Sequence, residues 1–116
     1  MSKTTPIAII GTGFAGLGMA IKLKEAGFED FVILEQGNDV GGTWRDNHYP
    51  GCACDVQSAL YSFSFEQNPN WSRMYAQQSE ILDYLRHCAE KYDLKRHIRF
   101  NTHVAGAHFD EKRNQW

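Results

Sequence analysis

Two short apolar runs, separated by a helical repeat, dominate the first third of the chain. The runs Ile7–Ile10 and Phe31–Leu34 contain only apolar residues, which is typical of strands in a parallel sheet covered on both faces. Between them, helical spacing predicts a helix over Phe14–Ala26, closed by Gly27 in a left-handed conformation. Helical spacing places Leu17, Ala20, Ile21 and Lys24 on one line of this helix, with Met19 and Leu23 beside it. The apolar members of this set should face the sheet. The order strand, helix, strand predicts an α/β fold with a central parallel sheet.

The remainder of the chain is patterned more weakly. The glycine- and aromatic-rich segment 36–70 lacks periodicity, except that Tyr61, Phe63 and Phe65 alternate with serines and predict a short strand. An irregular segment of this length is uncommon in a compact domain unless it has a function. Helical spacing returns from Glu80 to Tyr92, with Ser79 as the expected cap. Alternation of apolar and polar residues in 98–104 predicts a further strand, and residues 105–109 are expected to begin another, antiparallel segment.

The turn that joins the first run to the first helix has the sequence Gly-x-Gly-x-x-Gly, formed by Gly11, Gly13 and Gly16. These glycines permit a sharp turn, close approach of a pyrophosphate, and packing of the helix on the sheet. Glu35 ends the second run about 20 residues later, where a carboxylate accepts hydrogen bonds from ribose hydroxyls. An ordinary turn with a solvated Glu35 is the alternative. The sequence thus predicts a dinucleotide site formed by these residues together with Phe14 and Ala15 at the helix start, and Gln36.

Composition narrows the class of protein. The chain has 116 residues and a net charge of −2, which indicates one domain and gives no sign of attraction to nucleic acid or membranes. No apolar stretch approaches the ~20 residues of a bilayer span, and 1–6 does not resemble a signal peptide, so we expect a cytoplasmic protein. The three cysteines, Cys52, Cys54 and Cys88, are interpreted as structural thiols rather than ligands, and no metal site is predicted.

A restrictive series of motifs follows Glu35: Gly-Gly-Thr-Trp, Tyr-Pro-Gly, Cys-Asp-Val and Tyr-Ser-Phe-Ser-Phe, all within 41–65. On these motifs the chain resembles the FAD domain of class B flavoprotein monooxygenases, and among them the Baeyer–Villiger monooxygenases, from Ile7 to Trp116. The segment itself suits a flavin, because a large flat ring needs glycines for close approach and flat side chains as walls. A surface loop with a core aromatic cluster is the alternative.

The resemblance implies roles for individual residues. Gly42, Thr43 and Trp44 would lie against the flavin side of the cofactor, and Tyr61 would be a further flavin contact. Asp55 would be the catalytic aspartate near flavin and nicotinamide, facing an arginine from beyond this piece. Val104 would meet the adenine through its backbone. The chain departs from the family at 45–48, where Arg-Asp-Asn-His replaces aromatics. This departure puts any contact of Asp46 in doubt, and His48 is interpreted as an exposed loop residue.

The resemblance also implies an activity: an NADPH- and FAD-dependent monooxygenase that inserts one oxygen atom of O2 into a ketone or soft heteroatom through a C4a-peroxyflavin. Its partners would be a small organic substrate and O2. Residues 1–116 would be the incomplete N-terminal portion of the FAD-binding domain, an FAD/NAD(P)-binding Rossmann-like three-layer fold with a central parallel sheet. This portion would be inactive alone, with the NADPH domain beyond residue 116. The alternatives are an N-hydroxylating or sulfur-oxidising flavin monooxygenase, and a non-catalytic dinucleotide-binding domain. A disulfide reductase is disfavoured because the spacing of Cys52 and Cys54 does not fit its cysteine pair.

Overall fold

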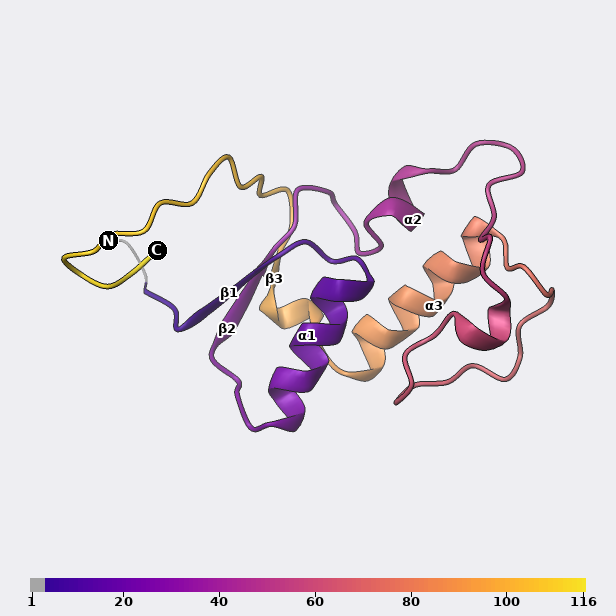
Figure 1. The fold of residues 1–116 in the computed structure, drawn as a ribbon, viewed down its shortest axis with the longest axis horizontal. Helices are drawn as coiled ribbons and strands as arrows, with labels where there is room; N and C mark the ends of the chain where they lie inside the picture. The colour runs from indigo at the N-terminus through magenta and orange to yellow at the C-terminus, as the bar shows by residue number, and fades with distance from the viewer. Residues whose placement is uncertain (1–3) are drawn as a thin grey trace.

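Three parallel strands form the sheet in the computed structural model, which describes residues 4–116 (Figure 1). β1 (Ile7–Ile10) pairs with β2 (Phe31–Leu34), which pairs in turn with β3 (Ile98–Arg99). The first two strands and the parallel α/β class are therefore confirmed. The predicted strand over 98–104 is wrong in length, because Asn101 adopts a left-handed φ of 53° and turns the chain out of the ladder.

Two helices pack against one face of this sheet. α1 (Phe14–Glu25) crosses from β1 to β2, and α3 (Gln78–Lys91) precedes β3. Their buried side chains share one core with alternate strand residues, among them Leu17, Ile21, Ile33, Leu85 and Cys88. The predicted inner line of α1 is confirmed, although Met19 is wrong as a flanking core residue since 55% of it is exposed. The opposite sheet face is open within residues 4–116, and Ile10 on that face is 65% exposed.

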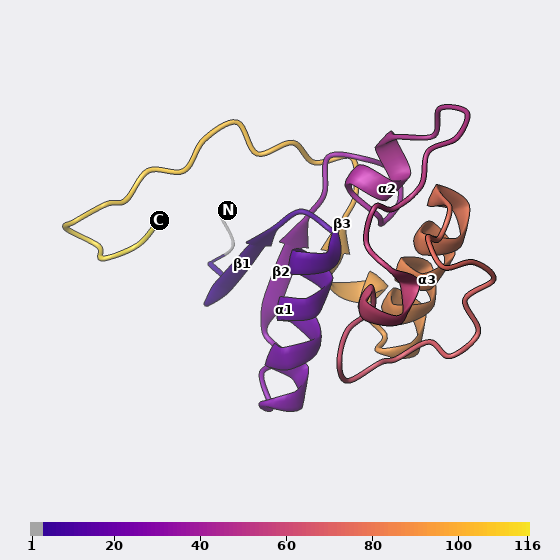
Figure 2. The ribbon, with the colours of Figure 1, turned by 45° about the vertical axis from the view of Figure 1, so that its right-hand side comes forward.

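The helix ends follow tertiary contacts more than local sequence. α1 ends one residue earlier than predicted, and Gly27 has the expected left-handed φ of 88°. α3 begins at Gln78, so Ser79 is not its cap. The backbone N–H of Gln78 donates to the carbonyl of Cys52 at 3.0 Å, and this bond from the preceding loop sets the helix start. Figure 2 shows how closely that loop passes α3.

The segment between β2 and α3 contains two short helical turns, α2 (Thr43–Asp46) and η1 (Ser58–Leu60). The predicted strand through Tyr61, Phe63 and Phe65 is wrong. A turn closes from the N–H of Glu66 to the carbonyl of Phe63 (3.1 Å), and the N–H of Phe63 donates to the hydroxyl of Tyr84 (2.9 Å). Because a side chain satisfies this backbone, no partner strand is needed.

A short helical turn, η2 (Lys95–His97), leads into β3, after which the chain runs away from the sheet (Figure 1). The end is a hairpin turn in which Asp110 and Gln115 form an isolated antiparallel bridge. Within residues 4–116, none of the helices combines the length and apolarity that crossing a bilayer requires.

Candidate functional site

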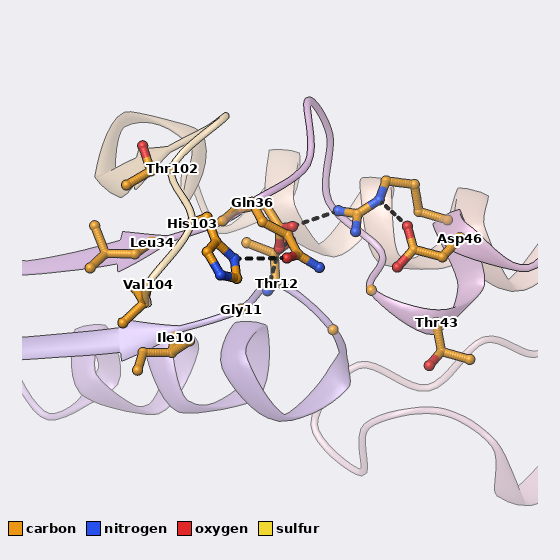
Figure 3. A pocket seen from close by; sticks show the side chains of 14 residues that line it. Ile10, Gly11, Thr12, Leu34, Gln36, Thr43, Asp46, Thr102, His103 and Val104 are labelled. Carbon is orange, nitrogen blue, oxygen red and sulfur yellow. Dashed lines mark hydrogen bonds and ion pairs between the residues drawn. The ribbon is translucent and has the colours of Figure 1, made fainter. Parts of the chain in front are cut away.

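A cavity of about 270 Å³ lies where β1 and β2 end and α1 begins (Figure 3). It therefore opens at the carboxyl edge of the sheet, where ligands bind in open α/β folds. Three segments far apart in the sequence meet there: the glycine turn, the end of β2 with the loop to α2, and the chain after β3. Its lining includes seven of the predicted cofactor-binding residues: Gly11, Gly13, Glu35, Gln36, Gly42, Thr43 and Val104.

The glycine turn is shaped by two close backbone contacts. A Cβ on Gly16 would lie 2.0 Å from the carbonyl oxygen of Gly11, so only glycine lets α1 pack on the turn. A Cβ on Gly42 would lie 3.1 Å from the Cα of Gly13, and Gly42 has a left-handed φ of 54°. The backbones of the two loops therefore approach each other without intervening side chains at the N-terminus of α1.

The start of α1 borders this cavity, whose lining includes Gly13 but not Phe14, Ala15 or Gly16. Its N-cap is Gly13, which provides no side-chain cap, and its first turn, within the described residues, contains no acidic side chain. The N–H groups of the first turn have no partner inside a helix, and the helix dipole adds about half a positive charge. Phe14, Ala15 and Gly16 lie in this turn. The arrangement suits an anion such as a diphosphate.

Among the described residues that line this cavity, Glu35 is the only buried acidic residue. Only 3% of its surface is exposed. Its Oε2 accepts hydrogen bonds from the N–H (2.9 Å) and hydroxyl (2.6 Å) of Thr12. Its Oε1 accepts from the N–H of Gly37 (2.8 Å) and from Nη1 of Arg45 (2.8 Å). Burial would raise the pKa of Glu35, but these hydrogen bonds and the charge of Arg45 outweigh it and lower that pKa. Glu35 is thus an ionised, oriented acceptor.

The chain after β3 forms another wall of the cavity. Figure 3 shows Val104 close to Ile10 at the end of β1, and His103 directed toward Gln36. Nδ1 of His103 lies 3.2 Å from Oε1 of Gln36. The wall is held to β2 because the N–H of Thr102 donates to the carbonyl of Glu35 at 2.8 Å. Mixed apolar and polar groups of this kind suit a planar heterocycle.

The predicted flavin contacts Trp44 and Tyr61 lie together but outside the lining of this cavity. Nε1 of Trp44 donates to the hydroxyl of Tyr61 at 3.1 Å. The ring of Tyr61 packs edge-on against Phe14, the first residue of α1, with centroids 5.0 Å apart. The Trp44–Tyr61 pair therefore lies next to the start of α1. Burial is the main reason that the pKa of Tyr61 is raised, with a smaller contribution from the charges of Cys54 and Asp55. Tyr61 therefore stays a neutral phenol near neutral pH.

Asp55, the predicted catalytic residue, is exposed and does not line the cavity. His48 is also exposed, as expected for a loop residue. Asp46 does line the cavity, where its Oδ1 accepts from Nε of Arg45 at 2.9 Å. The three cysteines are buried, and no group of metal-binding side chains forms among residues 4–116.

Two residues that this site depends on, Thr12 and Arg45, were not predicted from the sequence. Thr12 stands between two motif glycines and is fully buried, and Arg45 is 14% exposed although it sits in a polar-looking loop. The only signal was an arginine directly after the Gly-Gly-Thr-Trp motif, where the sequence departs from the family pattern. Nothing in the sequence showed that its guanidinium would reach back to Glu35.

Comparison with known proteins agrees with this geometry. The family model for the NAD(P)-binding Rossmann-like domain matches residues 9–78, which run from the end of β1 through the glycine turn, α1, β2 and α2 to the start of α3. The chain belongs to the NAD(P)-binding Rossmann-like domain family. A Baeyer–Villiger monooxygenase of Pseudomonas aeruginosa is 57% identical to this Rossmann-like chain over 110 residues, covering 95% of the chain and 21% of the relative.

Two solved structures are similar to the Rossmann-like chain. Oxidized steroid monooxygenase bound to NADP has a TM-score of 0.89 and 42% identity, covering 95% of the chain and 22% of that protein. OTEMO in complex with FAD and NADP has a TM-score of 0.87 and 35% identity, covering 97% and 22%. The resemblance to Baeyer–Villiger monooxygenases is therefore confirmed. The chain spans about a fifth of the length of the curated relatives that it matches first.

Proposed function

We propose that this chain is the front part of the FAD-binding domain of a flavin-dependent monooxygenase of the Baeyer–Villiger type, with FAD and NADPH as cofactors. The observation that carries the proposal is the cavity at the end of β1 and β2. It combines the donor-rich start of α1 with the ionised, buried carboxylate of Glu35. The 57% identity to a Baeyer–Villiger monooxygenase and the FAD and NADP in a similar structure support it.

The residues present fit an FAD. The diphosphate would lie at the start of α1, where the Gly13 and Gly42 backbones approach each other and a Cβ on Gly42 would fill the space. Glu35 would accept from the ribose of the adenosine, and Val104 would meet the adenine. The flavin would extend past Thr43 toward Trp44 and Tyr61, whose mutual hydrogen bond fixes both rings. The cofactor would supply the redox chemistry and the oxygen transfer.

The chain's own residues would orient the cofactor and exclude water. Trp44, Tyr61 and Phe14 form a contiguous aromatic surface, and such a surface keeps a reactive site dry. Asp55 is proposed as the catalytic aspartate. Its exposed carboxylate is available to groups supplied by the rest of the protein, among them the expected arginine and the nicotinamide.

The test uses the complete protein that contains this chain. Purified protein should be yellow, release FAD on denaturation, and oxidise NADPH with formation of an ester from a cyclic ketone or a sulfoxide from a thioether. Sulfoxide or N-oxide without any ester would favour the heteroatom-oxidising alternative. A folded, colourless protein that binds NAD but no FAD would overturn the proposal in favour of a non-catalytic dinucleotide-binding domain.

A further inference from the structure

The carboxylate of Glu35 has its full set of hydrogen-bond donors from this chain alone. A carboxylate has about four lone-pair positions, two on each oxygen. Thr12 occupies both positions on Oε2, and Gly37 and Arg45 occupy those on Oε1. A ribose hydroxyl can therefore reach Glu35 only by replacing or sharing one of these donors.

The four donors differ in how readily they give way. The N–H groups of Thr12 and Gly37 belong to the backbone and are fixed by the turns that contain them. The hydroxyl of Thr12 and the guanidinium of Arg45 are side chains. Arg45 has further partners, because Nη1 also donates to the carbonyl of Asp39 (2.7 Å) and Nε donates to Asp46 (2.9 Å). It can therefore release Oε1 and stay anchored.

We propose that Arg45 is a positioning residue that holds the Glu35 carboxylate in place for the dinucleotide and cedes its position on Oε1 to a ribose hydroxyl when the dinucleotide binds. This inference rests on the proposed function. The Arg45 side chain is 14% exposed and packs beside Gly37: a Cβ on Gly37 would lie 2.5 Å from Nη1 and 2.6 Å from Cζ. This packing, with the bonds to Asp39 and Asp46, keeps the Arg45 side chain at the site when it gives up Oε1.

The charge of Arg45 also matters for the buried carboxylate. Burial favours the protonated form of Glu35, and Arg45 contributes both a hydrogen bond and an opposite charge that lower its pKa. A protonated carboxyl loses acceptor capacity, so ribose binding holds above the pKa of Glu35 and weakens as the pH falls through it. Loss of Arg45 raises that pKa and moves this weakening to higher pH.

Other titratable and charged groups lie around Glu35, and their influence on the pH dependence of FAD binding has to be separated from that of Arg45. Asp46 touches Arg45 directly, and Asp39 lies on the same loop and pairs with Arg86 at 2.9 Å. His103 lines the same cavity and approaches Gln36. The comparison is therefore made in parallel in a His103→Gln background, which removes the only histidine that lines the described cavity.

The experiment measures the dissociation constant of FAD for the deflavinated complete protein, by flavin fluorescence, across a range of pH. Arg45→Gln should move the acidic loss of affinity to higher pH, so that within the shifted pH range it binds FAD roughly tenfold more weakly than the parent protein. Arg45→Lys, which keeps the charge but loses the planar fork, should lie between Arg45→Gln and the parent protein. Arg86→Gln is the matched control, since it removes an arginine bound to the same loop without touching Glu35.

Gly37→Ala gives an independent route that leaves the charge of Arg45 intact. The three heavy atoms nearest to its Cβ all belong to the guanidinium, so Gly37→Ala should displace Arg45 and reproduce part of the loss of affinity. In an Arg45→Gln background the same Cβ has more room, so Gly37→Ala should weaken FAD binding less than it does in the parent protein. Circular dichroism would reveal a variant that fails to fold, and the pH dependence of Arg45→Lys then still tests the role of Arg45.

The outcomes separate the inference from the function on which it rests. A parent protein that binds no FAD would overturn the proposed function. A parent that binds FAD while Arg45→Gln binds as tightly, or weakens equally at every pH and adds fully to Gly37→Ala, would overturn the role of Arg45 alone. A pH-shifted, non-additive loss is the result that we expect.

Discussion

Gly16 offers the sharpest test of how the glycine turn is built. Replacing it with alanine would place a Cβ 2.0 Å from the carbonyl oxygen and 2.9 Å from the carbonyl carbon of Gly11, and an ordinary contact begins at about 3.4 Å. Both neighbours are backbone atoms, so no side-chain rotation relieves the clash. Either the start of α1 or the end of β1 has to move by more than an ångström. Overpacking of this kind typically costs about 1–3 kcal/mol.

The gain in helix propensity offsets only part of this cost. Alanine is favoured over glycine by about 1 kcal/mol in a helix interior, and by less in the first turn, where Gly16 lies. We therefore expect Gly16→Ala to lower the free energy of unfolding by about 2 kcal/mol. It should also weaken FAD retention, because the shifted N-terminus of α1 no longer directs its N–H groups at the diphosphate.

Gly18→Ala is the matched control within the same helix. Its Cβ would lie 2.9 Å from Cε1 of Phe63, the outer part of a ring that can tilt, and Gly18 gains more helix propensity. Urea unfolding and FAD content of the complete protein should therefore change less in Gly18→Ala than in Gly16→Ala. A Gly16→Ala variant that keeps the parent urea midpoint and FAD content, or a Gly18→Ala variant that loses more of either, would refute this role of Gly16.

Three further predictions follow from the same structure. Glu35→Gln places an amide N–H₂ against groups that already donate, so FAD affinity should fall at least roughly tenfold, as measured by flavin fluorescence; unchanged affinity would contradict the ribose role. Asp55→Ala should reduce oxygenation far more than FAD content, and an equal loss of both would remove its catalytic assignment. Glu66 bonds Lys91 at 2.7 Å, and this bond, despite burial, helps lower its pKa to about 2. Its stabilisation is present above the ordinary pKa of about 4.5 and is lost as the pH falls toward 2, so thermal unfolding of Glu66→Gln and the parent should converge in acid.

Local patterns predicted the parts of the fold that local sequence determines. β1, β2 and α1 each have a complete signal within their own residues: an apolar run, a helical repeat, or a glycine at the turn. The extent of β3 was not predictable in this way. Its pairing with β2 ends at Leu34, and Asn101 then bends the chain so that the N–H of Thr102 donates to the carbonyl of Glu35.

The aromatic segment and the site show the same limit. Alternation of Tyr61, Phe63 and Phe65 fits a strand, but the hydroxyl of Tyr84, from a helix about 20 residues away, takes the backbone bond that a strand partner would take. In the cavity, the motif glycines and Glu35 were predictable because their spacing is fixed by the turn. Arg45 was not, because its role depends on a loop that folds back over 10 residues to reach Glu35.

The most direct test of the account is the structure of the complete protein crystallised with FAD. We predict a diphosphate at the start of α1 and an adenosine ribose hydroxyl within hydrogen-bonding distance of Glu35, with Nη1 of Arg45 withdrawn from Oε1. An FAD bound elsewhere, or a ribose that makes no contact with Glu35, would contradict the assignment of this cavity as the cofactor site.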